Sequence, residues 1–344
     1  MEMMNRMRLV DLKTMVSERV EIPVPEKDQV LIKVVNVGVC GSDISAFYGK
    51  HPYIPCPIVL GHEFSGYIEK VGAGVTDFEP GDRVTVLPHI GCGKCEACKN
   101  ETYNLCEDLK VIGCQTTGAH AEFVVAPAKV VFKLPDTMSM EEGAFVEPAS
   151  VGYHGVKNGM APGDNVLVMG SGTIGVFALQ AAIALGAGNV IIADYLDERL
   201  ALAKSLGADG TVDLSAETLE EGLTRLIGSP KKIDYFCECV GGNGRAMEEI
   251  IKLARRGTRI TSIGILSSNY SLPNLPDVTE HELKVFGSSM FVPDDFRDVI
   301  ELMGRGKIRV DGMVTHRYKL ADIKTMYEMI DGKKEKFFKI MISI

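Results

Sequence analysis

The chain has 344 residues, of which 46% are hydrophobic and 24% are charged. These are the fractions of a globular protein, and they argue against a disordered, collagen-like or coiled-coil chain. The length suits two domains, and a net charge of −9 without a long run of Lys or Arg disfavours nucleic acid and anionic membrane surfaces as partners.

The N-terminal segment lacks the apolar core of a signal peptide, and no later stretch reaches 18 uninterrupted apolar residues. We therefore expect a cytoplasmic protein. In such a reducing compartment, nine cysteines are expected to be metal ligands, catalytic groups or buried thiols rather than disulfides.

The first half of the chain is predicted to be β-rich, with short β-branched runs at 30–37 and 84–86 separated by Gly and Pro. Cys40, in Cys-Gly-Ser-Asp, and His62 with Glu63, in Gly-His-Glu, stand at the expected ends of such runs. A thiolate, an imidazole and a carboxylate can form a catalytic zinc site with an open position. Taken singly, a Cys is often just buried, and a His or Glu is more often a structural group with satisfied hydrogen bonds. Glu147, among small and apolar residues, needs a partner for its charge.

A cysteine cluster follows, with Cys92, Cys95, Cys98 and Cys106 spaced C-x2-C-x2-C-x7-C. Two-residue gaps allow a tight turn to direct successive sulfurs to one point, and four thiolates complete the tetrahedral shell of structural zinc. Two alternatives are less favoured. Four unrelated thiols on a loop would be prone to oxidation, and an iron–sulfur cluster is a weaker interpretation of this spacing than zinc. Because such a site leaves no position for substrate, we expect it to stabilise a lobe at about 89–110.

From residue 165 the pattern changes to short apolar strands alternating with helices, which is typical of a parallel α/β sheet. The predicted strands are 166–169, 190–193, 233–240 and 259–265, and the predicted helices are 174–185, 197–206 and 246–253. A Pro-containing link at 273–277 is expected to end this alternation, and the tail at 337–344 is again β-type. The predicted domains are therefore 1–149 with 286–344, and an inserted α/β domain at 150–285.

The first strand of this second domain leads into Gly170-Ser171-Gly172-Thr173-Ile174-Gly175, a G-x-G-x-x-G turn that opens a helix. Such glycines allow a tight turn, close approach of a pyrophosphate and close packing of helix on strand. Asp194 ends the next strand, where its carboxylate would accept ribose hydroxyls and repel a 2′-phosphate, so NAD is favoured over NADP. Nearby Arg199 offers some positive charge, and the alternative is a glycine turn that packs without binding a ligand.

Taken together and in this order, these motifs resemble the zinc-dependent medium-chain dehydrogenase/reductase superfamily over essentially the whole chain. Within it the sequence is most similar to the polyol dehydrogenases, because Glu147 stands in a Glu-Pro segment where liver-type alcohol dehydrogenases usually have Cys. The resemblance implies an α/β protein with a GroES-like β-rich catalytic domain and an inserted Rossmann domain with a doubly wound parallel sheet.

The resemblance also implies roles for particular residues. Cys40 and His62 would hold a catalytic zinc, Glu63 and Glu147 would exchange as ligands or lie one water away, and Ser42 would pass on the proton. The cofactor would contact the glycine turn, including Ile174, and also Asp194, Arg199, Gly264, Ile265, Ser288 and Ser289.

Two positions depart from the family pattern. Many members have a His five residues after the zinc Cys as an outer proton relay, and here this residue is Ser45. His51 is a candidate replacement, or an ordinary loop histidine. His120 stands where relatives commonly have an aromatic residue, and it alters the pocket or lies at the surface.

The expected activity is hydride transfer between NAD and a secondary alcohol of a polyol, sugar phosphate or sugar acid, with one catalytic and one structural Zn²⁺. L-threonine is the main alternative substrate. A protein of another class, a non-catalytic NAD-binding redox sensor or structural module, would keep only one zinc per chain. A homodimer or homotetramer is expected from the family.

Overall fold

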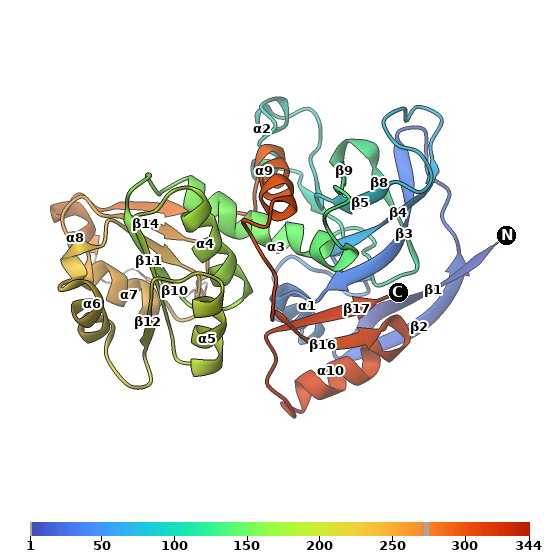
Figure 1. Ribbon diagram of the computed structural model, residues 1–344. Coiled ribbons are helices and arrows are strands. Elements are labelled where there is room, and N and C mark those ends of the chain that lie inside the picture. The colour runs from blue at the N-terminus through green and yellow to red at the C-terminus, as the bar shows by residue number, and fades with distance from the viewer. Residues whose placement is uncertain (1, 268, 272–274) are drawn as a thin grey trace. The chain divides into compact units, whose positions relative to one another are not determined.

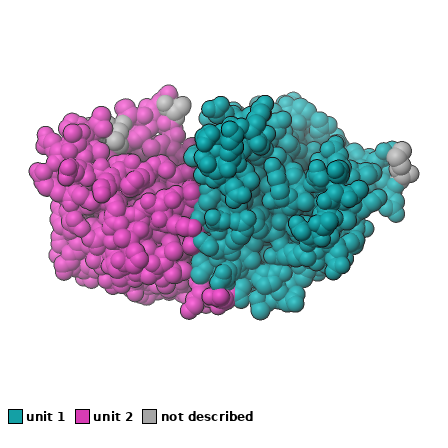
Figure 2. All heavy atoms as spheres, turned by 90° about the horizontal axis from the view of Figure 1, so that it is seen from above, with its two compact units in different colours: residues 1–147, 292–304, 314–344 teal, residues 148–291, 305–313 magenta. Residues whose placement is uncertain are grey.

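The computed structural model describes residues 2–267, 269–271 and 275–344. These divide into two compact units (Figure 2). Unit 1 comprises residues 1–147, 292–304 and 314–344, and unit 2 comprises residues 148–291 and 305–313. The short segment 305–313 thus groups with unit 2. Among the described residues, no helix is long and apolar enough to cross a bilayer.

Unit 1 is built on a seven-stranded, mainly antiparallel sheet with the order β16-β17-β3-β4-β5-β9, in which β8 also pairs with β3. The β-branched run at 30–37 lies in β3, which is flanked by both β4 and β17. The elements of unit 1 are β1 (Met3–Asp11), β2 (Thr14–Glu21), β3 (Gln29–Gly38), α1 (Gly41–Phe47), β4 (Glu63–Val71), β5 (Arg83–Val86), β6 (His89–Ile90), α2 (Glu96–Lys99), β7 (Lys110–Val111), β8 (Phe123–Pro127), β9 (Val131–Lys133), α9 (Pro293–Gly304), β16 (Val314–Lys319), α10 (Ile323–Asp331) and β17 (Lys339–Ser343).

Helix α3 (Met140–Lys157) begins in unit 1 and ends in unit 2, with Pro148 inside it. Glu147 is therefore a helical residue near the middle of α3.

Unit 2 contains a six-stranded, all-parallel sheet with the order β12-β11-β10-β13-β14-β15, covered on both faces by helices (Figure 1). The strand order reverses between β10 and β13, so that a crevice opens at the carboxyl ends of these strands. The elements of unit 2 are β10 (Asn165–Met169), α4 (Thr173–Ala184), β11 (Asn189–Asp194), α5 (Asp197–Ser205), β12 (Gly210–Asp213), α6 (Leu219–Ile227), β13 (Tyr235–Glu238), α7 (Arg245–Leu253), β14 (Arg259–Ser262), α8 (Leu275–Glu280) and β15 (Lys284–Gly287).

One core of unit 2 lies between the sheet and helices α6 and α7. It packs the fully buried strand residues Leu167, Phe236 and Ile260 against Leu223 and Ile250 of the helices. Because the strands of a parallel sheet are covered on both faces, they are continuous apolar runs, and that pattern identifies them in the sequence.

The prediction that the α/β alternation ends at the 273–277 link is wrong. Residues 273 and 274 of that link lie outside the described residues, but α8 begins at Leu275 and β15 adds a sixth parallel strand. Pro276 is in the first turn of α8, where a missing backbone N–H costs no helical hydrogen bond. The fold class itself, a GroES-like sheet together with a Rossmann-type sheet, is confirmed.

Candidate functional site

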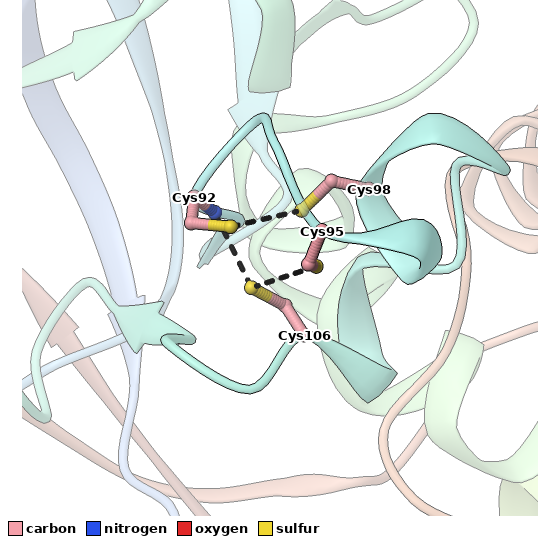
Figure 3. Close-up of side chains that lie close together, drawn as sticks. All are labelled: Cys92, Cys95, Cys98 and Cys106. Atoms are coloured by element: carbon pink, nitrogen blue, oxygen red, sulfur yellow. Dashed lines mark hydrogen bonds between the residues drawn. The ribbon is translucent and has the colours of Figure 1, made fainter.

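The cysteine cluster is assembled by one short segment of unit 1 (Figure 3). Cys95 caps α2, Cys98 lies within that helix, and Cys92 and Cys106 approach from the flanking loops. The four sulfurs lie within 4.8 Å of one another, with Cys92 Sγ 4.0 Å from Cys98 Sγ and Cys95 Sγ 3.7 Å from Cys106 Sγ. Backbone N–H groups of Lys94 and Cys95 lower the pKa of Cys92 to about 6, which favours a thiolate. Four converging thiols with this support fit a zinc ion.

A second cluster forms where β3 and β4 meet. Cys40 follows β3 and caps α1, while His62 immediately precedes β4 and Glu63 begins it, pairing there with Gly38 of β3. Ligand atoms of Cys40, His62 and Glu63 lie within 4.8 Å of one another. Since His62 and Glu63 are only 6% and 1% exposed, the polar atoms converge in a desolvated place, which fits a metal ion better than solvated side chains.

Asp43 is a buried carboxylate behind His62 that the sequence reading missed. Its Oδ2 accepts a hydrogen bond from the Cys40 backbone N at 2.9 Å, and its Oδ1 lies 3.7 Å from His62 Nδ1. Burial lowers the pKa of His62, but the negative charges of Asp43 and Cys40 outweigh burial and hold it well above its usual value. A carboxylate behind a ligating imidazole fixes the orientation of the ring.

Lys339, which the sequence reading also missed, forms an ion pair with Glu63 Oε2. It is the first residue of β17 and is 4% exposed. Burial lowers the pKa of Lys339, while Glu63 and Cys40 raise it, with a net rise. One signal in the sequence could have found it, because Lys339 is the only charged residue of β17 and is followed by Ile, Met and Ile.

Glu147 is buried on α3 but lies outside the group formed by Cys40, His62 and Glu63. The pKa of Glu147 is raised to about 7, mainly by burial. The charge of His62 lowers this pKa, and the charge of Glu63 raises it. Glu147 is therefore part of the same electrostatic environment.

The proton-relay candidates lie around this cluster. Ser42 and Ser45 are half-buried on α1, and His51 is half-buried in the loop after it, with its Nδ1 accepting a hydrogen bond from Tyr53 N at 3.2 Å. Burial lowers the pKa of His51, and so does His62. The possibility that His120 lies at the surface is wrong. It is fully buried, and neither ring nitrogen has a hydrogen-bond partner in the described part of the chain.

In unit 2 a cavity of about 510 Å³ opens at the carboxyl ends of β10, β11 and β13. Its lining residues are Met169, Gly170, Gly172, Ala193, Asp194, Tyr195, Arg199, Leu214, Cys239, Val240, Asn243, Arg245, Ala246 and Glu249. Gly170 has φ +93°, and a Cβ on Gly175 would lie 1.8 Å from the Gly170 carbonyl oxygen. Gly172 caps α4, so that backbone N–H groups at the start of α4, including those of Thr173 and Ile174, are available to a phosphate.

Asp194 carries a feature that the sequence did not indicate, because its carboxylate accepts four hydrogen bonds from the chain itself. Oδ2 accepts from Ser171 N at 2.7 Å and from Ser171 Oγ at 2.9 Å. Oδ1 accepts from Tyr195 N at 2.7 Å and from Leu196 N at 3.1 Å. Asp194 therefore holds the glycine turn in place in addition to lining the cavity.

The remaining predicted cofactor residues follow β14 and β15, at the same sheet edge as the glycine turn. Gly264 packs so closely on the backbone that a Cβ there would lie 2.2 Å from Gly241 N, whereas Ile265 is 83% exposed. The backbone N–H of Ser288 donates a hydrogen bond to the carbonyl oxygen of Ser262 at 2.9 Å, which continues the pairing of β14 with β15 by one residue. Ser289 is the next residue along the chain. None of these four residues lines the 510 Å³ cavity.

Two family models match the chain. Residues 26–136 match the alcohol dehydrogenase GroES-like domain, and residues 173–305 match the zinc-binding dehydrogenase model. Sorbitol dehydrogenase of Bacillus subtilis is 34% identical over 330 residues, covering 93% of this chain and 92% of that protein. Galactitol 1-phosphate 5-dehydrogenase of Escherichia coli is 34% identical over 317 residues, covering 88% and 89% of the two chains.

Solved structures give the same result. A zinc-binding dehydrogenase of Sinorhizobium meliloti bound to NADP superimposes with a TM-score of 0.92 at 32% identity, covering 100% of both chains. An Escherichia coli alcohol dehydrogenase complexed with NADH superimposes with a TM-score of 0.91 at 28% identity, again over 100% of both chains.

The fold and the two cysteine-containing clusters define a metal-dependent, nucleotide-linked dehydrogenase. The chain belongs to the zinc-containing medium-chain alcohol dehydrogenase family, as the sequence predicted, with polyol and sugar dehydrogenases among its relatives. It has a four-cysteine structural zinc site and a Cys/His/Glu catalytic site, and its cofactor is a nicotinamide nucleotide.

Proposed function

We propose that this chain is a zinc- and NAD-dependent oxidoreductase that oxidises a secondary alcohol of a polyol, sugar phosphate or sugar acid, or reduces the corresponding ketone. The observation that carries the proposal is the convergence of the half-buried Cys40 with the buried His62 and Glu63, whose ligand atoms lie within 4.8 Å of one another. The relatives named sorbitol dehydrogenase and galactitol 1-phosphate 5-dehydrogenase support the substrate class.

The chemistry of the donor set favours zinc at this cluster. Cys40, His62 and either Glu63 or Glu147 would hold the ion, which would act as a Lewis acid and make the substrate hydroxyl more acidic, while the nicotinamide accepts the hydride. The chain itself supplies orientation and proton transfer. The Asp43 carboxylate, 3.7 Å from His62 Nδ1, would orient the ring electrostatically, and the burial of His62 and Glu63 limits the access of water to these two ligands.

Oxidation of the alcohol releases one hydride and one proton. A bound nicotinamide would take up the hydride, so the proton would have to leave through the chain's own groups. The Ser42 hydroxyl can accept one proton while donating another, and it is half-buried beside Cys40. With Ser45 in place of the usual histidine, we propose that the proton passes from Ser42 to water, with His51 as the next acceptor.

We propose NAD rather than NADP as the cofactor. The carboxylate of Asp194 lines the cavity at the end of β11, where its negative charge would repel a 2′-phosphate. Arg199 lies in the same cavity and works in the opposite direction. We further propose a cytoplasmic homodimer or homotetramer, which sedimentation equilibrium of the purified protein would test.

The test combines a substrate screen with two matched variants. Wild-type protein should form NADH with at least one compound in a panel of polyols, sugar phosphates, aldonates and L-threonine. Cys40→Ser should abolish turnover while leaving NADH binding intact, and Cys56→Ser, which changes an exposed thiol outside both clusters, should keep full activity. Full activity of Cys40→Ser would refute the assignment.

Two alternatives are separated by the same experiments. Turnover confined to L-threonine would make the chain a threonine 3-dehydrogenase. A non-catalytic redox sensor or structural protein would contain one zinc per chain and form no NADH with any compound.

A further inference from the structure

A buried cation lies directly beside the candidate catalytic metal site. The Lys339 ammonium group forms an ion pair with Glu63 Oε2, and the two residues are 4% and 1% exposed. They begin β17 and β4, which flank β3 on its two sides. The ion pair therefore has to cross β3 to form.

Gly38 is the residue of β3 at which this crossing occurs. It pairs with Glu63 on one side and with Met341 on the other. A Cβ at Gly38 would lie 2.2 Å from Glu63 Oε2 and 3.1 Å from Lys339 Cε. Gly38 is not among the glycines with positive φ, so its backbone conformation does not require glycine. Glycine is needed here because a side chain would occupy the space of the Glu63–Lys339 ion pair.

The same carboxylate has two possible cationic partners. Besides contacting Lys339, Glu63 has an oxygen in the group of ligand atoms that it forms with Cys40 and His62. Lys339 also interacts electrostatically with Cys40 and Glu147, so its positive charge lies amid the groups that would hold the metal. Such a charge repels a dication and competes with it for Glu63.

We propose that Lys339 is a positioning residue that competes with the catalytic metal for Glu63, and that Gly38 provides the space in which this competition takes place. Lys339 holds one carboxylate oxygen of Glu63 on the β17 side, so that only the other oxygen is free to approach the metal. The positive charge of Lys339 also weakens the bond between that oxygen and the metal. The inference rests on the proposed function in one respect, namely that Cys40, His62 and Glu63 bind a metal ion.

The experiment compares the zinc-loaded wild-type protein with Lys339→Met, Lys339→Arg and Gly38→Ala. Lys33→Met is the matched control, because Lys33 is an exposed lysine on the same strand as Gly38. Zinc per chain is first measured by mass spectrometry. The rate at which the second zinc passes to a chromogenic chelator is then followed, and the vacated site is refilled with Co²⁺ to record its visible spectrum.

In Lys339→Met, release of the second zinc should slow about tenfold, the scale on which residues around metal ligands alter affinity. Its Co²⁺ spectrum should also shift, whereas Lys339→Arg and Lys33→Met should resemble wild type. Gly38→Ala displaces the carboxylate while keeping every charge, so its Co²⁺ spectrum should also depart from wild type.

A merely structural role for Lys339 would lower the unfolding midpoint but leave the release rate and spectrum of folded Lys339→Met unchanged, and this result would overturn the inference. If Lys339→Met does not fold, Gly38→Ala decides the matter, and a wild-type spectrum there would refute it. A wild-type protein with one zinc per chain would instead refute the proposed function.

Discussion

Replacement of Asp194 by Asn tests the idea that this carboxylate both holds the glycine turn and selects the cofactor. An amide has a single acceptor oxygen, so it can replace either the two hydrogen bonds from Ser171 or those from Tyr195 and Leu196, but not all four. Each hydrogen bond to a charged group is worth about 1.5–3 kcal/mol. Because Asp194 is half-buried, we take the lower value and expect a loss of about 3 kcal/mol in unit 2.

Cofactor selection should change as well. Two unit charges 4 Å apart interact by about 4 kcal/mol near a protein surface, and solvent and salt reduce this to about 1–2 kcal/mol in an open cavity. Loss of the negative charge should therefore raise the ratio of kcat/KM for NADP to that for NAD about tenfold.

Two assays check these expectations. The chain has no Trp, so unfolding in urea is best followed by circular dichroism, and initial rates with each cofactor give the selectivity. Asp213→Asn is the control, since Asp213 accepts from Ser215 N and Oγ in the same way at the end of β12 but does not line the cavity. If Asp194→Asn keeps both the wild-type midpoint and the wild-type selectivity, the reasoning about this carboxylate is wrong.

Three further predictions follow from particular residues. Gly172→Ala should bind NADH poorly yet unfold like wild type, because the nearest atom to the new Cβ is Arg199 Nη1 at 3.8 Å, whereas Gly175→Ala should both bind NADH poorly and destabilise unit 2. NADH titration measures the binding and calorimetry measures the stability of the two variants. Equal stability of the two would contradict the packing argument. Cys95→Ser should lose the structural zinc and make the lobe sensitive to trypsin while NADH binding persists, and an intact lobe would count against zinc as its stabiliser. Burial lowers the pKa of His120 to about 4 in the folded protein, whereas in the unfolded chain it is about 6.5, so the contribution of His120 to stability, about 3 kcal/mol, is present above pH 6.5 and is lost as the pH falls toward 4. His120→Phe should therefore reduce the difference in unfolding free energy between urea titrations at pH 7 and pH 5. An unchanged difference would refute this role of His120.

The sequence was most informative where the interacting residues are close together along the chain. The spacing of Cys92 to Cys106 predicted the metal lobe, and the glycine turn after a buried strand predicted the cavity of unit 2. In both cases local backbone geometry places the groups, and a short motif contains that information.

The sequence was least informative where strand pairing brings distant residues together. Nothing around Glu63 indicates that its partner is Lys339, because that contact depends on β17 pairing with β3. Proline was also read too strictly. Pro276 lies in the first turn of α8, although the link that contains it was predicted to end the α/β alternation.

The ion pair across β3 also bears on the order in which the molecule is assembled. The zinc lobe closes over a short loop, so it can form as soon as its own residues have left the ribosome. The ion pair between Glu63 and Lys339, in contrast, cannot form until β17, which is synthesised much later, has paired with β3. Under the proposed competition, a metal ion that enters before β17 has paired would meet the Glu63 carboxylate without Lys339 beside it.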